Sequence, residues 1–250
     1  MNDRQEKIYM LLCKQGSISM DQLKNEIFAS EATLRRDLSK MEQEGLLKRT
    51  WGGAVASGGK NSDPPFFLRS NTNVAEKNSI SKLAVEFMEN NMTVFLASGT
   101  TVTRLAKRFY KYSNLTVITN GLDVADALKN HPSAKVIILG GELYENYDLV
   151  GSLTENAIDS FNADIFFFSC SGITAQGFTS LDMARLEVIK KMKNNSSKTV
   201  LLTDNSKVGK KYSYNGFGFE CIDHVVMDAM PSDAELRRVL GRKMIVPKSV

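Results

Sequence analysis

The 250-residue sequence predicts a mainly parallel α/β domain that is preceded by a small winged helix-turn-helix domain. Two observations lead to this fold class. Residues 1–57 contain short segments with helically spaced apolar side chains, helix-capping signals and a glycine pair. Residues 74–250 instead contain short, continuous apolar runs that alternate with helical segments, as in parallel sheets whose strands are buried on both faces. Residues 58–73 are expected to link the two domains.

Composition narrows the class of protein. The 32 Lys and Arg residues exceed the 28 Asp and Glu residues by only 4, so attraction to nucleic acid must come from the placement of charge on one face. The three cysteines form no CxxC pair and the two histidines are isolated, so we expect neither a disulfide framework nor a metal site, and no cofactor. The polar N-terminus and the lack of an apolar run of roughly 20 residues predict a reduced, cytoplasmic protein.

Three short helices are expected in the first 45 residues. The first follows Asn2 or Asp3, and the second begins at Ser19 with the S-x-x-Q pattern of a capping box. The third begins at Ser30, whose hydroxyl can cap the first turn, and ends at Gly45. Its apolar stripe is spaced i, i+4, i+7 and faces a small core: Leu34, Leu38 and Met41.

The opposite face of the third helix is polar and carries cations, among them Arg36 and Lys40. A helix of this kind fits the major groove of DNA, where its first half meets base edges and its cations hold phosphates. Two short extended segments then flank Gly52 and Gly53, which is typical of a β-wing.

The linker is predicted from its Gly, Ser, Asn and Pro content, and the apolar residues Phe66–Leu68 are expected to dock its end on the second domain. An amphipathic helix then covers Ile80 to Met88. The strands of the sheet are expected at seven apolar runs: Thr93–Leu96, Leu115–Thr119, Lys135–Leu139, Asp164–Phe168, Thr199–Leu202, His224–Met227 and Lys243–Val246.

Small polar loops follow five of these strands. Ligands of open α/β sheets bind outside the carboxyl ends of the strands, and glycines, hydroxyls and free N–H groups there can bind the oxygens of an anion. Each loop alone is also typical of an ordinary turn or helix cap, but five together favour a pocket for a polar small molecule. The loops are Ala97–Thr101, Thr119–Gly121, Gly140–Glu142, Ser169–Ile173 and Asp204–Lys207.

Taken together, these residues resemble the DeoR family of bacterial transcriptional regulators. The first domain matches the family's spacing at Arg4, Ile8, Leu12, Ser30, Thr33–Leu38, Gly45–Leu47, Arg49 and Gly52–Ala54. The second domain matches it in order at Ser98–Thr101, Thr119–Asn120, Gly140–Gly141, Val150–Gly151, Gly172–Ile173, Glu187 and Asp204–Lys207.

The resemblance implies a non-enzymatic repressor of carbohydrate-metabolism genes that forms a dimer or tetramer. Its second domain would resemble the sugar-phosphate isomerase fold of ribose-5-phosphate isomerase and would sense a phosphorylated sugar or related metabolite. The residues implied for operator DNA are Ser30, Thr33, Arg35, Arg36, Lys40, Arg49, Trp51 and Gly52. Those implied for the effector are Ser98, Gly99, Thr100, Thr101, Thr119, Asn120, Gly121, Gly141, Gly172 and Lys207.

Three positions depart from the family's pattern. Ala97 and Ser171 stand where the family usually has acids that would accept hydrogen bonds from sugar hydroxyls, and Trp51 stands where it usually has histidine. The sequence therefore leaves the identity of the effector open. It also leaves open the alternative that the second domain binds no effector and only assembles subunits.

The rival function is a sugar-phosphate isomerase, which needs a base, usually a carboxylate, beside a C–H bond. Nothing in the sequence singles out one of the candidate carboxylates: Glu142, Asp182, Glu187 and Asp204.

Overall fold

The computed structural model describes residues 2–56, 64–144 and 147–248. The chain forms two compact units, Met1–Leu68 and Arg69–Val250. Each unit has a hydrophobic core of its own, and each is described by itself below.

The division between the units falls inside the linker predicted over residues 58–73, of which 58–63 lie outside the described residues. The helix α4 (Phe66–Asn71) spans this division. Leu68 is 2% exposed and packs in the core of the first unit. The expectation that it docks on the second domain is therefore wrong, because the core of the first unit buries this side chain instead.

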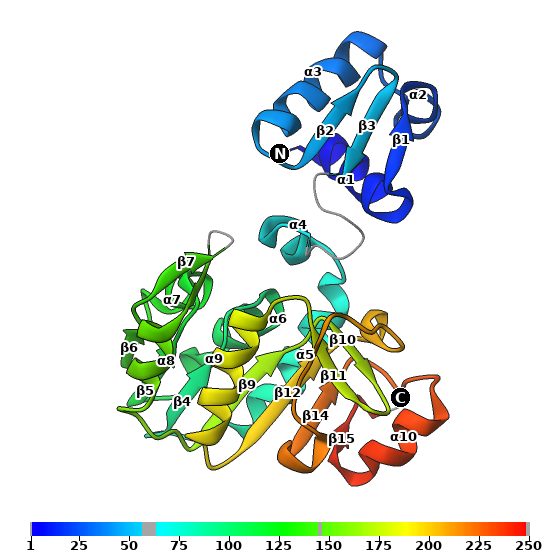
Figure 1. The fold of residues 1–250 in the computed structure, drawn as a ribbon. Helices are drawn as coiled ribbons and strands as arrows, with labels where there is room; N and C mark the ends of the chain where they lie inside the picture. The colour runs from blue at the N-terminus through cyan, green and yellow to red at the C-terminus, as the bar shows by residue number, and fades with distance from the viewer. Residues whose placement is uncertain (1, 57–63, 145–146, 249–250) are drawn as a thin grey trace. The chain divides into compact units, whose positions relative to one another are not determined.

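The first unit is a winged helix-turn-helix, as predicted (Figure 1). Its antiparallel sheet has the order β1-β3-β2, in which β1 is a strand that the sequence does not predict, since three residues are too few to show strand alternation. Its elements are α1 (Asp3–Gln15), β1 (Ser17–Ser19), α2 (Met20–Ile27), α3 (Glu31–Gln43), β2 (Leu47–Thr50) and β3 (Gly53–Ala56).

The predicted caps of the three helices are present. The Asn2 side chain accepts from the N–H of Gln5 at 2.9 Å, and Ser19 forms a capping box. Ser30 accepts from the N–H of Thr33 at 3.3 Å. The core beneath contains the predicted stripe of α3 and apolar side chains of α1 and α2, each at most 1% exposed: Ile8, Leu12, Leu23, Leu34, Leu38 and Met41.

The second unit is built on the predicted sheet, and the seven strands of this sheet are all parallel. The order in the described part is β15-β14-β12-β9-β4-β5-β6. All seven predicted runs form its strands: β4 (Thr93–Leu96), β5 (Leu115–Thr119), β6 (Ala134–Ile138), β9 (Ile165–Ser169), β12 (Thr199–Thr203), β14 (His224–Met227) and β15 (Met244–Ile245).

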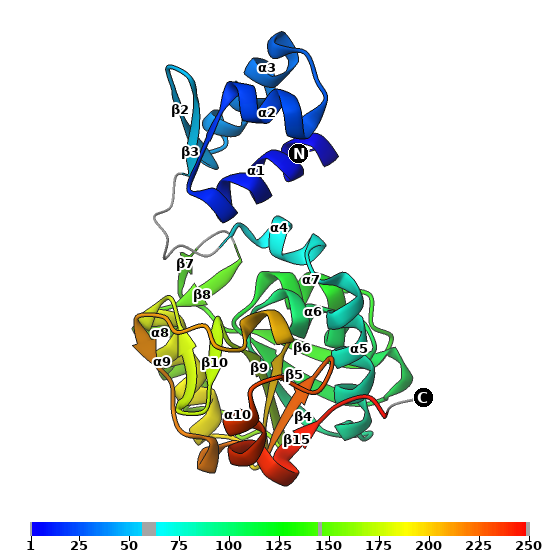
Figure 2. The ribbon, with the colours of Figure 1, turned by 90° about the vertical axis from the view of Figure 1, so that its right-hand side faces the viewer.

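Helices cover both faces of this sheet, which explains the continuous apolar runs (Figure 2). In β4, Val94 and Leu96 face one core while Phe95 faces the other, and all three are fully buried. The first core lies under α5 (Val74–Ala84), η1 (Val85–Phe87), α6 (Thr100–Ala106), η2 (Phe109–Lys111) and α7 (Leu122–Leu128). The second lies under α8 (Ser152–Ile158), α9 (Met183–Asn194), η4 (Phe219–Cys221) and α10 (Ala234–Leu240).

The remaining short strands and single helical turns of the second unit lie outside the parallel sheet. They include β7 (Glu142–Tyr144), β8 (Asp148–Val150), β10 (Gly172–Thr174), β11 (Gly177–Ser180), β13 (Tyr214–Asn215), η3 (Asn205–Lys207) and η5 (Gly241–Lys243). In the described part of the chain, every helix falls short of the length and apolar character that crossing a bilayer requires.

Candidate functional site

A carboxylate at the start of α3 holds two cations. Glu31 accepts a hydrogen bond from Arg35 Nη2 at 2.8 Å and lies 2.5 Å from the ammonium of Lys24 on α2. These contacts, that of Lys24 first, hold the pKa of Glu31 below its ordinary value. The side chain of Arg35 remains 63% exposed, so it can still meet a partner although it is already paired.

Arg36 differs from its neighbours on α3. It is exposed, and it makes no hydrogen bond or ion pair with the residues that the structure describes. At the far end of the helix, Lys40 lies 4.0 Å from Glu44. At the near end, the hydroxyls of Ser30 and Thr33 are 2.8 Å apart. Arg36 is therefore the guanidinium of α3 that is free to bind an anion or a base.

The wing is a tight hairpin with an exposed aromatic tip. Trp51 and Gly52 alone join β2 to β3, and the Trp51 side chain is fully exposed. Glu42 on α3 accepts from both the backbone N–H and the Nε of Arg49, at 2.7 and 2.6 Å. This pair fixes the base of the wing against α3, so that the two elements form one surface.

A buried carboxylate also joins α3 to α1. Asp37 is 5% exposed; its Oδ2 accepts from Arg4 Nε at 2.5 Å and its Oδ1 accepts from Gln5 Nε2 at 3.0 Å. The contacts of Asp37 with α1 were not predicted, although its position between Leu34 and Leu38 puts it beside the apolar stripe of the helix.

The loop after β4 already binds a carboxylate of the protein. Ser98 Oγ donates to Asp123 Oδ1 at 2.9 Å, and the N–H of Gly99 donates to Oδ2 at 3.1 Å. The Thr103 hydroxyl donates to the same Oδ2 at 2.5 Å. Asp123 belongs to α7 and is 5% exposed. Ser98 and Gly99, whose donors were predicted to bind the anion of a ligand, therefore bind the carboxylate of Asp123 instead.

The predicted residues after β5 bind the loop after β4. Asn120 Oδ1 accepts from the N–H of Ser98 at 3.1 Å, and its Nδ2 donates to Leu149 O at 3.0 Å. Thr119 Oγ1 accepts from the N–H of Gly121 at 2.9 Å. A Cβ on Gly121 would lie 2.9 Å from Ser98 Cα, so the two loops are in direct contact.

The predicted glycines of the later loops lie where backbones approach closely. A Cβ on Gly141 would lie 1.9 Å from Thr154 Oγ1, and a Cβ on Gly172 would lie 2.2 Å from Lys210 O. The Thr154 hydroxyl donates to Gly140 O at 2.7 Å. Packing alone accounts for both glycines, and their role toward a ligand stays a prediction.

Two lysines and an aspartate gather where β12 ends. Lys207 Nζ donates to Ser169 Oγ at 2.9 Å and lies 4.0 Å from Asp204 Oδ2. Asp204 is 1% exposed, and this oxygen has no hydrogen-bond partner within the described residues. Burial, and then the charge of Lys207, lower the pKa of Lys77 on α5 to about 8.

The structure thus brings the predicted effector residues to one edge of the sheet, because β12, β9, β4, β5 and β6 are neighbours whose carboxyl ends point the same way. Thr100 and Thr101 begin α6 there and are buried. Lys77 and Asp123 were not among the predicted site residues. A single lysine or aspartate in a helix carries no sign that its charge is buried.

Two of the four carboxylates of the isomerase alternative, Asp182 and Glu187, have ordinary local roles. Asp182 accepts from the N–H of Arg185 at 2.9 Å as the cap of α9. Glu187 and Lys190 form an ion pair within the same helix at 2.8 Å. Glu142 is exposed.

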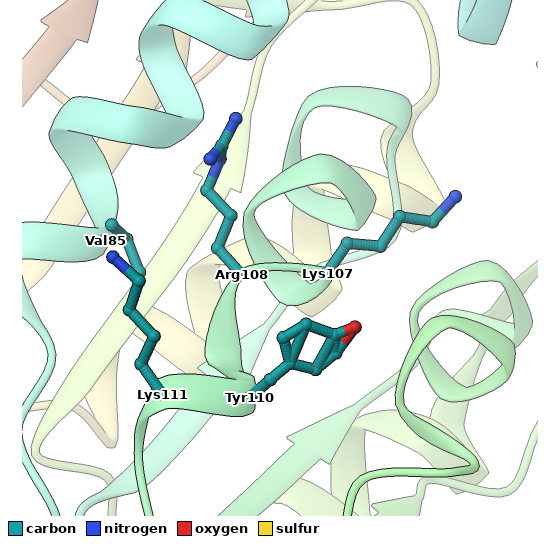
Figure 3. Close-up of a pocket in the computed structure, with 5 residues that line it drawn as sticks. All are labelled: Val85, Lys107, Arg108, Tyr110 and Lys111. Atoms are coloured by element: carbon teal, nitrogen blue, oxygen red, sulfur yellow. The ribbon is translucent and has the colours of Figure 1, made fainter.

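A shallow pocket of about 210 Å³ lies away from these residues, at the far end of α6 (Figure 3). Arg108 extends from it toward α5, where its Nε donates to Ser81 Oγ at 2.7 Å. None of the predicted site residues lines this pocket: Val85, Lys107, Arg108, Tyr110 and Lys111 do. No group of three metal-ligating side chains occurs within the described residues.

A winged helix-turn-helix with an exposed third helix, followed by a parallel α/β unit with polar loops at its strand ends, defines a DNA-binding transcriptional regulator. The chain matches the model of the DeoR-like helix-turn-helix domain over residues 4–58 and that of the DeoR C terminal sensor domain over residues 72–229. The chain belongs to the DeoR family.

Relatives agree with this assignment. The chain is 34% identical to the HTH-type transcriptional regulator GolR of Listeria innocua, over 90% of each chain. It is 30% identical to the glycerol-3-phosphate regulon repressor of Escherichia coli, over 91% of each. The structure of ribose 5-phosphate isomerase A from Methanocaldococcus jannaschii overlaps with a TM-score of 0.39 at 16% identity, and the match spans only 54% of each chain.

Proposed function

We propose that this regulator represses carbohydrate-metabolism genes in the cytoplasm, binds operator DNA as a homo-oligomer, and responds to a phosphorylated sugar without catalysing a reaction. The name of the Escherichia coli relative, a glycerol-3-phosphate regulon repressor, supports the gene class. The single observation that carries the proposal is the exposed face of α3, on which Arg36 has no partner among the described residues.

In the proposed complex, α3 lies in the major groove of the operator and the wing lies beside it. Arg36 contacts a base or a phosphate, and Arg35 and Arg49 add charge while they keep their carboxylate partners. Trp51 and Gly52 at the wing tip meet the neighbouring backbone. Two subunits would place two such surfaces on related half-sites.

The proposed effector site is the sheet edge formed by the loops after β4, β5, β9 and β12. Lys207 and Lys77 supply positive charge, and the free Oδ2 of Asp204 can accept a hydrogen bond from a sugar hydroxyl. The phosphate would replace the carboxylate of Asp123 on Ser98 and Gly99. An effector that favours one arrangement of the subunits would then change operator affinity.

Selection of bound duplexes from a random pool, with and without a panel of sugar phosphates that includes glycerol 3-phosphate, tests both halves of the proposal. We expect one enriched sequence whose affinity changes with one member of the panel. Failure to enrich any sequence would contradict DNA reading. An enriched sequence with no thermal stabilisation by any sugar phosphate would favour a second unit that only assembles subunits, a role that the occupied β4 loop also suits.

Replacing Arg36 by alanine should weaken binding to the selected duplex by about 1–3 kcal/mol, roughly 5- to 150-fold, if it reads a base. Random DNA would then be affected less than the selected sequence. If Arg36 holds a phosphate instead, both affinities should fall alike and the salt slope should flatten by about one unit. Anisotropy titrations at several salt concentrations measure this. Arg238→Ala, which removes an exposed charge from α10, is the matched control; unchanged binding by Arg36→Ala would contradict the placement of α3.

Binding of a phosphorylated effector should load a proton onto Lys77. Its pKa of about 8 lies below the ordinary 10.5, so at about pH 8.5 the free lysine is mostly neutral, and a nearby phosphate raises its pKa and favours the charged form. At about pH 6.5 it is charged with and without ligand, so no uptake is expected from it. Calorimetry in two buffers of different ionisation enthalpy measures the uptake. Lys77→Met should abolish it and Lys107→Met should not; equal heats in both buffers at the higher pH would contradict the prediction.

A further inference from the structure

The turn between α2 and α3 contains a strained aromatic residue. Phe28 caps the C-terminus of α2 with φ 53° and ψ 44°, and its N–H donates to Lys24 O at 3.1 Å. This left-handed conformation suits glycine or asparagine, whereas the Cβ of a bulky side chain is crowded in it. The local backbone would therefore be better satisfied by a smaller residue.

The ring of Phe28 gains nothing from the fold to offset this strain. It is 88% exposed, and it is absent from the core cluster of the first unit. The turn is braced by other groups, since Lys24 pairs with Glu31 across it at 2.5 Å and Ser30 caps α3. An outlier held by its surroundings at a functional surface points to a role outside the fold.

The position of Phe28 indicates the partner. It stands two residues before Ser30, the N-cap of α3, so the two Cα atoms are at most about 7 Å apart. The first turn of α3 is the part of such a helix that meets base edges. In the major groove, phenylalanine contacts the 5-methyl group of thymine, which is the apolar feature of the groove.

We propose that Phe28 is a specificity residue that packs on a thymine methyl group at the edge of the operator half-site. This inference rests on the proposed placement of α3 in the major groove. The ring reads an apolar group while Arg36 reads a polar or charged one. The exposed ring then makes apolar contacts only in the complex with DNA. The strained turn holds the ring in the exposed position that this contact requires.

The test uses the full chain and the duplex selected from the random pool without added sugar phosphate. Phe28→Gly should weaken binding about tenfold, because a lost apolar contact of this size is worth about one order of magnitude in affinity. In the wild type, replacing the contacted thymine by uracil, which lacks the methyl group, should weaken binding by a similar factor. In Phe28→Gly the same replacement should have no further effect. Met10→Ala, which trims another exposed apolar side chain of this unit, should change neither result.

Thermal unfolding separates this role from a structural one. Phe28→Gly and Phe28→Asn suit the left-handed turn, so neither should lower the melting temperature of the first unit. Unchanged affinity, or equal sensitivity to uracil in wild type and variant, would overturn the proposal. So would a changed oligomeric mass in sedimentation with an unchanged uracil profile, which would assign the ring to a contact between subunits. If Phe28→Gly leaves operator affinity unchanged but Arg36→Ala still lowers it, the proposed function stands without this inference. If neither substitution changes operator affinity, the proposed function is contradicted as well.

Discussion

Replacing Asp37 by alanine is expected to destabilise the first unit and so weaken operator binding, while the second unit keeps its stability. Asp37 accepts from Arg4 on α1 and from the amide of Gln5, and the latter side chain is 2% exposed. Without the carboxylate, the buried amide loses its partner, at a cost of about 1–3 kcal/mol. A small unit with a single core has little stability to spare.

Hydrogen exchange by mass spectrometry on the full chain resolves the two units. Peptides from residues 2–56 should lose protection in Asp37→Ala, and those from 69–144 should keep it. Asp21→Ala is the matched control, because this aspartate lies on α2 with 91% of its side chain exposed. Full protection of both parts in Asp37→Ala would show that the α1–α3 link is dispensable.

The second large effect is expected from Asp123→Asn, which should bind inorganic phosphate and glycerol 3-phosphate about tenfold or more tightly than the wild type. The carboxylate of Asp123 holds donors from Ser98 and Gly99 in the loop after β4 and from Thr103 on α6. A phosphate at that loop must displace it and meets its negative charge, and removal of a like charge at contact distance is worth at least about 1 kcal/mol. The unliganded variant should be less stable, because three donors lose their ionised acceptor.

Titration calorimetry with both phosphates on the wild type and the variant gives the affinities, and thermal denaturation without ligand gives the stabilities. Asp126→Asn serves as the control: this exposed aspartate lies three residues further along α7 and pairs with Lys129 at 2.8 Å. Equal or weaker phosphate binding by a folded Asp123→Asn protein would show that the loop is a structural contact and that a ligand binds elsewhere.

Most of the fold could be predicted from short-range patterns in the sequence, namely helix caps and apolar runs. The capping residues Ser19 and Ser30 fix where α2 and α3 begin, because an orphan N–H needs an acceptor wherever the helix is placed. The strand runs, such as Thr93–Leu96, are apolar at every position because helices cover both faces of the sheet. These features depend on neighbours in the chain, and the sequence displays them directly.

The parts that the sequence did not predict depend on contacts between distant segments. Asp37 lies 33 residues from Arg4 in the chain, and Asp123 lies 25 residues from Ser98. Asp37 lies beside the apolar stripe of its helix, but the local pattern around either carboxylate does not indicate its distant partner. The predicted site residues share one edge of the sheet because strand order placed them there. Which of them touch a ligand remains a prediction, since several already bind one another.

The wing tip has a practical consequence. Trp51 is the sole tryptophan of the chain, and its indole is entirely in water. Indole emission, excited at wavelengths where the seven tyrosines do not absorb, therefore comes from the tip of the wing. A water-exposed indole already emits at long wavelength, so denaturation leaves its colour almost unchanged and is nearly invisible by this signal. If the wing tip meets DNA as proposed, stacking of the indole on a sugar or nucleobase would quench this emission, and the unlabelled chain would report binding of the duplex.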